Sequence, residues 1–237
     1  MKRVGIVCAL AAEARHLGPT TPPHQALASL ADGTLLAVSG MGGNAAGVSA
    51  RALIEAGAGA LASFGLAGGL DPALPAGAIF LPSEVSALNA APTSTTAHWR
   101  ERLSAALAAH SPLTQGRLLS CPRAVATVAQ KAALFRETGA VAVDMESVAV
   151  AEAAGARHLP FIAVRVIVDT AQDSLPPSVS AAADSTGPLQ LWRLIGALAC
   201  SPAQLAPLIR LARRYRLASR SLAVVGRAGS LAAHAFS

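Results

Sequence analysis

The chain of 237 residues is poor in aromatic and charged side chains. Aromatic residues make up 3% and charged residues 14%, whereas hydrophobic residues make up 53%. A disordered chain has the opposite composition and is therefore excluded. The hydrophobic share is mostly Ala, Leu and Val, which predicts aliphatic packing of helices on a sheet. No uncharged apolar run reaches the roughly 18 residues expected of a transmembrane helix.

Cysteine is also sparse, and its number and spacing argue against a disulfide-linked fold and against a structural zinc site. Cys8, Cys121 and Cys200 are odd in number and scattered, which argues against a disulfide framework and fits a reducing cytoplasm. No CxxC or paired Cys/His spacing is present, so we expect no metal site. The apolar run 4–10 has no convincing cleavage site and leads into Glu13, which predicts a buried strand rather than a signal peptide.

Acidic residues are nearly missing from the C-terminal quarter. Residues 1–173 hold twelve basic and twelve acidic residues, whereas residues 174–237 hold seven arginines and one acid, so the formal charge of +6 arises there. Five of these arginines fall within eleven residues: Arg210, Arg213, Arg214, Arg216 and Arg220. A neutral main body argues against a nucleic-acid partner, while the basic end could contact phosphates.

Apolar runs bounded by Gly and Pro alternate with helical patterns along the chain. The runs that predict strands are 4–9, 34–39, 60–66, 78–88, 117–121, 140–145 and 161–169. The stretches that predict helices are 10–17, 44–57, 97–110, 124–138, 146–157, 188–200 and 203–222. This order predicts one α/β domain over 1–200, with a central, mixed but mostly parallel sheet flanked by helices. Residues 173–188 read as a mobile loop, and residues 201–237 as a basic helical extension packed on the domain.

Two Gly-rich segments follow predicted strands. Residues 39–44 end one strand and begin an Ala-rich helix, where backbone N–H groups suit an anion or a sugar; a plain tight turn is the simpler interpretation. Residues 64–70 do not form GxGxxG and no acid follows at the distance that binds ribose. A Rossmann-type oxidoreductase is therefore disfavoured.

The few acids of the main body stand at strand ends, where open α/β sheets bind ligands. Asp144 and Glu146 close one apolar run, and Asp169 closes another. We expect Asp144 to cap the helix that begins near Ser147. For Arg165 we favour a buried ion pair over substrate contact. Glu13 follows the first strand, where stabilisation of a helix dipole would suffice to explain it.

Taken together, five segments resemble one enzyme superfamily, that of purine nucleoside phosphorylases and methylthioadenosine/S-adenosylhomocysteine nucleosidases. They are 4–13, 39–42, 65–70, 142–146 and 160–169, in the order of the family. The resemblance covers most of residues 3–200. The most similar branch is that of the hopanoid-associated phosphorylases, which share the long basic C-terminal extension.

The resemblance implies cleavage of a ribosyl N-glycosidic bond in an adenosine-type nucleoside, with no resident cofactor and with water or inorganic phosphate as acceptor. Asp169 would protonate the purine at N7 or hold a donor there, and Glu13 would activate water. Glu146 would hold ribose hydroxyls and Met145 would pack on the sugar. The remaining positions assigned to substrate are Gly40, Met41, Gly42, Leu66, Ala67, Gly68, Ala124, Val125 and Val168.

The chain departs from the family at three of these positions. Leu66 and Val168 stand where nucleosidases usually have Ser, and Ala124 stands where an aromatic would stack on the base. These departures leave room for a bulky apolar substituent. They also motivate a second hypothesis, a nucleoside-binding protein without turnover, although Glu13, Glu146 and Asp169 are all retained.

The nucleophile and the partners stay open at this stage. Glu13 favours water, because a carboxylate takes a proton from water but repels phosphate; Arg15, Arg51 or Arg123 could supply positive charge for phosphate. We expect a homodimer in the cytoplasm. The helical stripe Leu205, Leu208, Ala212, Tyr215, Ala218 and Leu222, flanked by arginines, could rest on the anionic inner membrane or pack on the domain with a solvated basic face.

Overall fold

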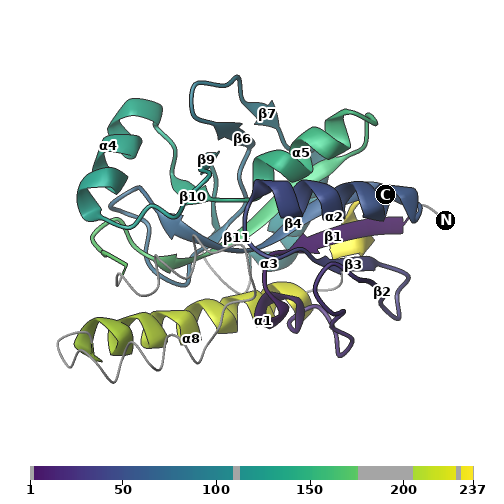
Figure 1. Ribbon diagram of the computed structural model, residues 1–237, viewed down its shortest axis with the longest axis horizontal. Helices are drawn as coiled ribbons and strands as arrows, with labels where there is room; N and C mark the ends of the chain where they lie inside the picture. The colour runs from purple at the N-terminus through teal and green to yellow at the C-terminus, as the bar shows by residue number, and fades with distance from the viewer. Residues whose placement is uncertain (1–2, 109–112, 176–204, 228–230, 237) are drawn as a thin grey trace.

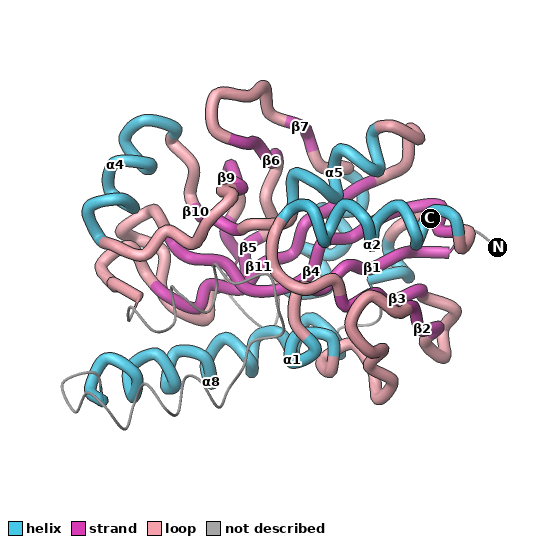
Figure 2. Tube along the Cα trace, in the orientation of Figure 1, coloured by secondary structure: helices cyan, strands magenta, loops and turns pink. Residues whose placement is uncertain are grey.

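The structure is a computed structural model that describes residues 3–108, 113–175, 205–227 and 231–236. A mixed sheet runs through the centre with helices on both faces (Figure 1, Figure 2). The predicted single α/β domain with a mostly parallel sheet is thereby confirmed. The predicted helix 188–200, the domain boundary at 200 and most of the predicted loop 173–188 lie outside the described residues.

The elements follow the predicted alternation. The strands are β1 (Arg3–Cys8), β2 (Leu27–Ser29), β3 (Leu35–Val38), β4 (Ala58–Gly69), β5 (Ile79–Phe80), β6 (Glu84–Ala87), β7 (Thr93–Ser94), β8 (Leu113–Thr114), β9 (Arg117–Ser120), β10 (Ala142–Asp144) and β11 (Phe161–Asp169). The helices are α1 (Ala11–Ala14), α2 (Gly43–Glu55), α3 (Ala97–Leu107), α4 (Val128–Thr138), α5 (Ser147–Gly155), α8 (Leu205–Arg227) and the short 3-10 helix η2 (Leu231–His234).

The sheet divides at β4, and this fork positions the strand ends. Its main path runs β2-β3-β1-β4-β10-β9-β6-β7, and β11 joins it at β4. Strand β4 lies parallel to β1 and β11, but its last two residues, Gly68 and Gly69, pair with β10 in the antiparallel sense. Gly68 also lies opposite Asp169 of β11. The ends of β4, β10 and β11 therefore meet at one place.

Both faces of the sheet are covered, which explains why its central strands are apolar throughout. Helices α2 and α5 cover one face and contact each other, and α8 packs against β11 on the other face (Figure 1). Ala46, Ala50 and Leu53 of α2 are buried on the first side, whereas Trp99 and Leu103 of α3 are buried on the second. The core is mainly aliphatic, as the composition predicts.

The side chains of α8 that the structure shows in this core lie toward the C-terminal end of the helix. Ala218, Leu222 and Val225 are buried, and the Ser221 hydroxyl donates to the Gly77 carbonyl at 2.7 Å. Earlier in the helix Ile209 is 53% and Leu217 is 47% exposed. Of the predicted apolar stripe, Ala212 is exposed, Tyr215 is partly buried, and Ala218 and Leu222 are buried.

Three predicted elements differ from the structure, two of them for identifiable reasons. The predicted strand 78–88 is two strands, because Pro82 between β5 and β6 has no N–H for a ladder. The predicted helix 124–138 begins only at Val128, because Thr127 and Gln130 form a capping box with reciprocal hydrogen bonds of 3.2 and 3.1 Å. The predicted helix 10–17 is a single turn, α1.

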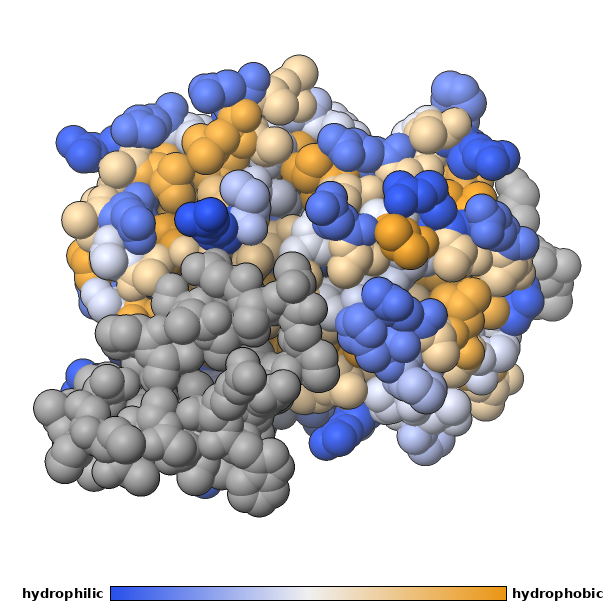
Figure 3. Space-filling view, in the orientation of Figure 1, coloured by the Kyte–Doolittle hydropathy of each residue, from blue (hydrophilic) through white to orange (hydrophobic). Residues whose placement is uncertain are grey.

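Hydrophilic residues are scattered over the face seen in Figure 3, between smaller groups of hydrophobic ones. None of the helices in the described part of the chain combines the length and the apolar character that crossing a bilayer requires.

Candidate active site

A pocket of about 170 Å³ opens at the fork of the sheet. It gathers residues that follow the C-terminal ends of several strands, as expected for an α/β sheet. Most of the predicted site residues line it: Glu13, Met41, Leu66, Ala67, Gly68, Ala124, Val125, Met145, Glu146, Val168 and Asp169. Gly40 and Gly42 line an adjoining groove of about 1210 Å³, which shares Met41, Arg123 and Met145 with the pocket.

Glu13 is held by backbone groups at the end of β1. Its side chain accepts the N–H of Leu10 at 2.9 Å, which caps α1, and the N–H of Leu66 in β4 at 2.9 Å. The residue is 4% exposed. Burial raises the pKa of the Glu13 carboxyl above its ordinary value, against the opposing effects of the Arg165 guanidinium and of backbone hydrogen bonds. Glu13 is therefore more than a helix-capping acid, since it bridges two elements of the pocket.

Gly65 is what allows Glu13 to come this close to β4. A Cβ atom at this position would lie 2.6 Å from Oε1 of Glu13, well inside van der Waals contact. The close approach explains a glycine in the middle of a buried strand, where a side chain would otherwise be expected to pack.

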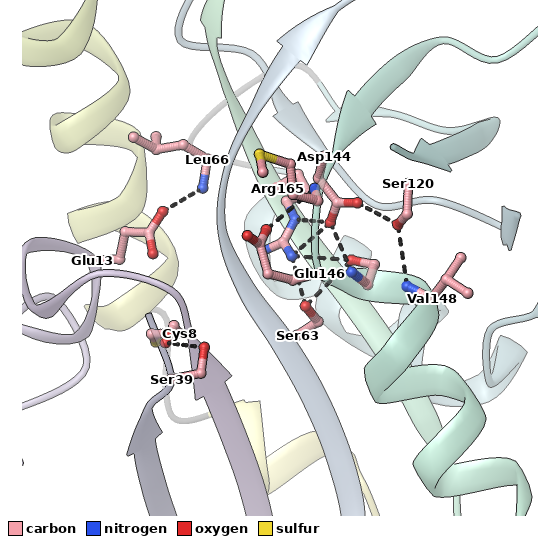
Figure 4. A network of polar contacts seen from close by, with 12 residues as sticks. Cys8, Glu13, Ser39, Ser63, Leu66, Ser120, Asp144, Glu146, Val148 and Arg165 are labelled. Atoms are coloured by element: carbon pink, nitrogen blue, oxygen red, sulfur yellow. Dashed lines mark hydrogen bonds and ion pairs between the residues drawn. The ribbon is translucent and has the colours of Figure 1, made fainter. Parts of the chain in front are cut away.

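A buried ion pair stands on the other side of β4 (Figure 4). Nε and Nη2 of Arg165 donate to Oδ2 of Asp144 at 2.9 and 2.7 Å, and Nη2 also donates to the Ser63 hydroxyl at 2.6 Å. The same carboxylate accepts the N–H of Ser147 at 3.1 Å. The predicted capping role of Asp144 and the predicted ion pair of Arg165 are both confirmed.

Glu146 lies next to this pair and faces the pocket. Its Oε1 accepts the N–H of Gly42 at 2.8 Å, and its Oε2 accepts the N–H of Met145 at 3.3 Å. Burial, and then the charge of Asp144, raise the pKa of Glu146 to about 7. The Gly42 N–H at the start of α2 is thus bound to a carboxylate. This N–H group is therefore not free for an anion, contrary to what the Gly-rich segment 39–44 had suggested.

The charges of the site do not balance locally. Glu13, Asp144 and Glu146 all act electrostatically on the single guanidinium of Arg165 and raise its pKa. Burial is the main cause of the raised pKa values of Glu13 and Glu146, and the charges of Asp144 and Glu13 add to the effect at Glu146. Such a pocket stabilises a positive charge that develops on a ligand.

Asp169, at the end of β11, has a partner that the sequence did not indicate. The ammonium group of Lys131 on α4 forms a buried ion pair with Oδ2 of Asp169 and donates to the Thr170 carbonyl at 2.7 Å. Burial raises the pKa of the Asp169 carboxyl, while Lys131 acts in the opposite direction. The one available signal was compositional, because Lys131 is one of only two lysines and stands in an apolar stretch.

The rest of the wall is apolar. Leu66, Ala124, Val125 and Val168 line the pocket as predicted, and Leu175 joins them. None of these five side chains carries a hydroxyl or a ring. Of the three arginines considered for phosphate, Arg123 lines both cavities and Arg51 lines only the groove, whereas Arg15 lines neither.

Solved structures with the same fold include those of nucleosidases and of a futalosine hydrolase. The 5'-methylthioadenosine/S-adenosylhomocysteine nucleosidase of Neisseria meningitidis, in complex with methylthio-immucillin-A, is 18% identical over 95% of this chain and 96% of its own, with a TM-score of 0.68. A mutant of the Helicobacter pylori nucleosidase with 5'-methylthioadenosine in its active site is 17% identical, over 85% and 100%, with a TM-score of 0.66. Futalosine hydrolase of Helicobacter pylori is 17% identical, over 84% and 98%, with a TM-score of 0.65.

At these identities the likeness shows the fold, not the substrate. A search of curated proteins returned no match. The family assignment rests instead on a sequence model of the phosphorylase superfamily, which matches residues 3–187. This range contains every element from β1 to β11 and the whole predicted site. The chain therefore belongs to the phosphorylase superfamily.

Proposed function

We propose that this protein hydrolyses the N-glycosidic bond of a purine nucleoside. The observation that carries the proposal is the excess of buried carboxylates around Arg165, described above. As the bond to the base breaks, ribose acquires oxocarbenium character, and its positive charge is stabilised by the negative surroundings of Glu13 and Glu146.

Water is the nucleophile that suits Glu13. A buried carboxylate with a raised pKa accepts a proton from water efficiently, because its proton affinity lies nearer to neutral pH. A phosphate dianion would be repelled by the same carboxylates. Arg123 is the described cation that could hold phosphate at this pocket, since it lines the pocket and the groove.

Glu146 accounts for sugar binding in this proposal. Its carboxylate oxygens are held by the N–H groups of Gly42 and Met145 and face the pocket. Each oxygen has a lone pair left for a ribose hydroxyl. Met145, beside it in the wall, packs on the sugar, and Asp169 holds the base from the opposite strand end.

The apolar wall points to a nucleoside with a bulky apolar 5′ substituent. Leu66 and Val168 replace hydroxyl side chains by aliphatic ones, Leu175 adds further aliphatic surface, and the pocket adjoins a much larger groove. A hopanoid nucleoside, which the most similar branch suggested, has this chemistry. The related structures with 5'-methylthioadenosine or methylthio-immucillin-A hold smaller substituents.

The proposal is tested by incubating the protein with adenosine-type nucleosides that differ in the 5′ substituent, with and without phosphate. We expect release of free base and ribose at a rate that phosphate does not change. Glu13→Gln should lower kcat by about 10²–10⁴-fold, because the general base is lost. Glu101→Gln, an exposed position on α3, is the matched control and should retain wild-type activity.

Two results would overturn this assignment. A rate that requires phosphate, with ribose 1-phosphate as product and Glu13→Gln fully active, would make the protein a phosphorylase. Binding of nucleosides by calorimetry with no release of base from any of them would favour the non-catalytic nucleoside-binding protein.

We further propose that the basic half of α8 lets the protein act at an anionic membrane surface. Arg210, Arg213 and Arg216 are exposed, and two apolar side chains of the same stretch of the helix, Ile209 and Leu217, are exposed as well. A basic helix with exposed apolar groups binds anionic lipid reversibly. Such contact would give the enzyme access to a lipid-linked nucleoside.

A further inference from the structure

Lys131 is the buried charged group that the proposed chemistry does not yet use. Its side chain is 0% exposed, although lysine is almost never fully buried unless it is paired. It lies on α4, outside the strand ends that supply the other site residues, and it reaches Asp169 at the end of β11. Stability alone does not explain a lysine at this position, since apolar groups can often replace a buried ion pair with no loss of stability.

The two oxygens of Asp169 have different surroundings. Oδ2 contacts the ammonium group of Lys131, which is itself fixed by its bond of 2.7 Å to the Thr170 carbonyl. In the part of the chain that the structure describes, Oδ1 has no hydrogen-bond partner, and Asp169 lines the pocket. One oxygen is thus anchored and the other is left for a ligand.

Two further charged groups, Arg214 and Asp173, act on Asp169, and they form an ion pair with each other. Arg214 of α8 forms an ion pair with Asp173. The Asp173 carboxylate also accepts the N–H and the hydroxyl of Thr170 at 2.9 and 2.7 Å. Asp173 disfavours ionisation of Asp169 and Arg214 favours it. Lys131 is therefore the cation in direct contact that counteracts the burial of Asp169.

We propose that Lys131 is a positioning residue that keeps Asp169 ionised and presents its Oδ1 as a hydrogen-bond acceptor to an N–H group of the departing purine. This inference rests on the proposed function and specifies the role of Asp169 within it. A neutral Asp169 would leave the ammonium group of Lys131 buried without a counter-charge, which is far more costly than the ion pair.

With Asp169 ionised, the proton that the departing purine gains must come from a source other than this carboxyl. The purine takes its N7 proton from solvent, not from Asp169. The C1′–N9 bond breaks with its electron pair on the purine, whose N7–H is held by Oδ1 of Asp169. The attacking water forms the C1′–O bond and gives its proton to Glu13, which returns it to solvent. Oδ1 of Asp169 therefore stabilises the purine once N7 carries this proton, which favours departure of the base.

Lys131→Met tests the inference through the pH dependence of kcat/KM. Without the ammonium group, burial and Asp173 raise the Asp169 pKa further and Arg214 alone opposes them. The acid limb should therefore shift upward by about 1–3 pH units, the usual effect of an adjacent opposite charge. Activity should recover toward the wild-type value at high pH. Lys131→Arg keeps the charge and should keep the limb near its wild-type position.

Arg136→Met is the matched control, because it removes a positive charge from an exposed position of the same helix. It should leave the acid limb unchanged. A loss in Lys131→Met by the same factor at every pH would reduce Lys131 to a structural residue. An upward shift of the basic limb, with the acid limb unchanged, would show that Asp169 works as a neutral acid. Either result overturns the inference.

A titration of the Asp169 carboxyl carbon by NMR, assigned with Asp169→Asn, decides the matter independently of turnover and of the folding of Lys131→Met. Ionisation complete by about pH 6, near the range of ordinary carboxyls, supports the inference. A carboxyl still protonated at about pH 8 refutes it. A wild-type protein that released no base would refute the proposed function while this titration still reported on Lys131.

Discussion

Glu146→Gln separates the contribution of Glu146 to function from its effect on stability. The pKa of Glu146 rises from 4.5 to about 7 on folding, chiefly through burial. Between these two values the folded state binds more protons than the unfolded state, so the stability due to this group falls as pH increases. A shift of about two and a half units corresponds to about 3 kcal/mol at 1.36 kcal/mol per unit. The glutamine has no charge to bury and keeps one acceptor oxygen for Gly42.

We therefore expect Glu146→Gln to gain about 3 kcal/mol relative to wild type between pH 4 and pH 8 while losing most of its activity. Urea unfolding at several pH values measures the difference, with Glu101→Gln as the control whose difference from wild type should not change with pH. If the stability difference between Glu146→Gln and wild type were the same at pH 4 and pH 8, the pKa of Glu146 would not be raised by folding. The electrostatic account of the pocket would then fail.

Two further predictions concern Gly65 and α8. Gly65→Ala places a methyl group 2.6 Å from Oε1 of Glu13, so it should break the bond from the Leu66 N–H and lower kcat about 10–100-fold, as expected for a hydrogen bond to a charged group. Stopped-flow or steady-state kinetics on the folded variant would detect this, and an unchanged kcat would place the reacting water away from Glu13. For α8, wild type should sediment with anionic but not neutral liposomes at low salt. Replacing Arg210, Arg213 and Arg216 by Gln should weaken binding by about two orders of magnitude at about 1 kcal/mol per arginine. Equal binding to neutral vesicles, or no effect of the triple substitution, would reject the membrane proposal.

The sequence was most informative where function depends on the end of a strand. Asp144, Glu146 and Asp169 each close an apolar run, so the topology of a parallel sheet already brings them to one edge. The capping role of Asp144 and the ion pair of Arg165 followed from local pattern and from the cost of burying charge. The sheet itself was predictable, because strands covered on both faces are apolar at consecutive positions.

The sequence was least informative where contact is made across the fold. Lys131 reaches Asp169 from a helix 38 positions earlier in the chain, and no periodicity relates a lysine on α4 to an acid on β11. The use of the Gly42 N–H by Glu146, 104 positions away, was hidden for the same reason. Short elements such as β8 contain two residues, which is too few for a pattern of alternation to emerge.

The departures at the pocket wall affect the substrate more than the chemistry. At Leu66 the backbone N–H binds Glu13, while the side chain lines the pocket. A change from Ser to Leu at this position alters the shape and polarity of the wall but leaves the bond to Glu13 in place. Val168 likewise lines the wall, while the next residue, Asp169, keeps its pairing with Lys131. We therefore expect substitutions of this kind to redirect specificity and to preserve turnover, which favours the proposed enzyme with an altered substrate over a protein without activity.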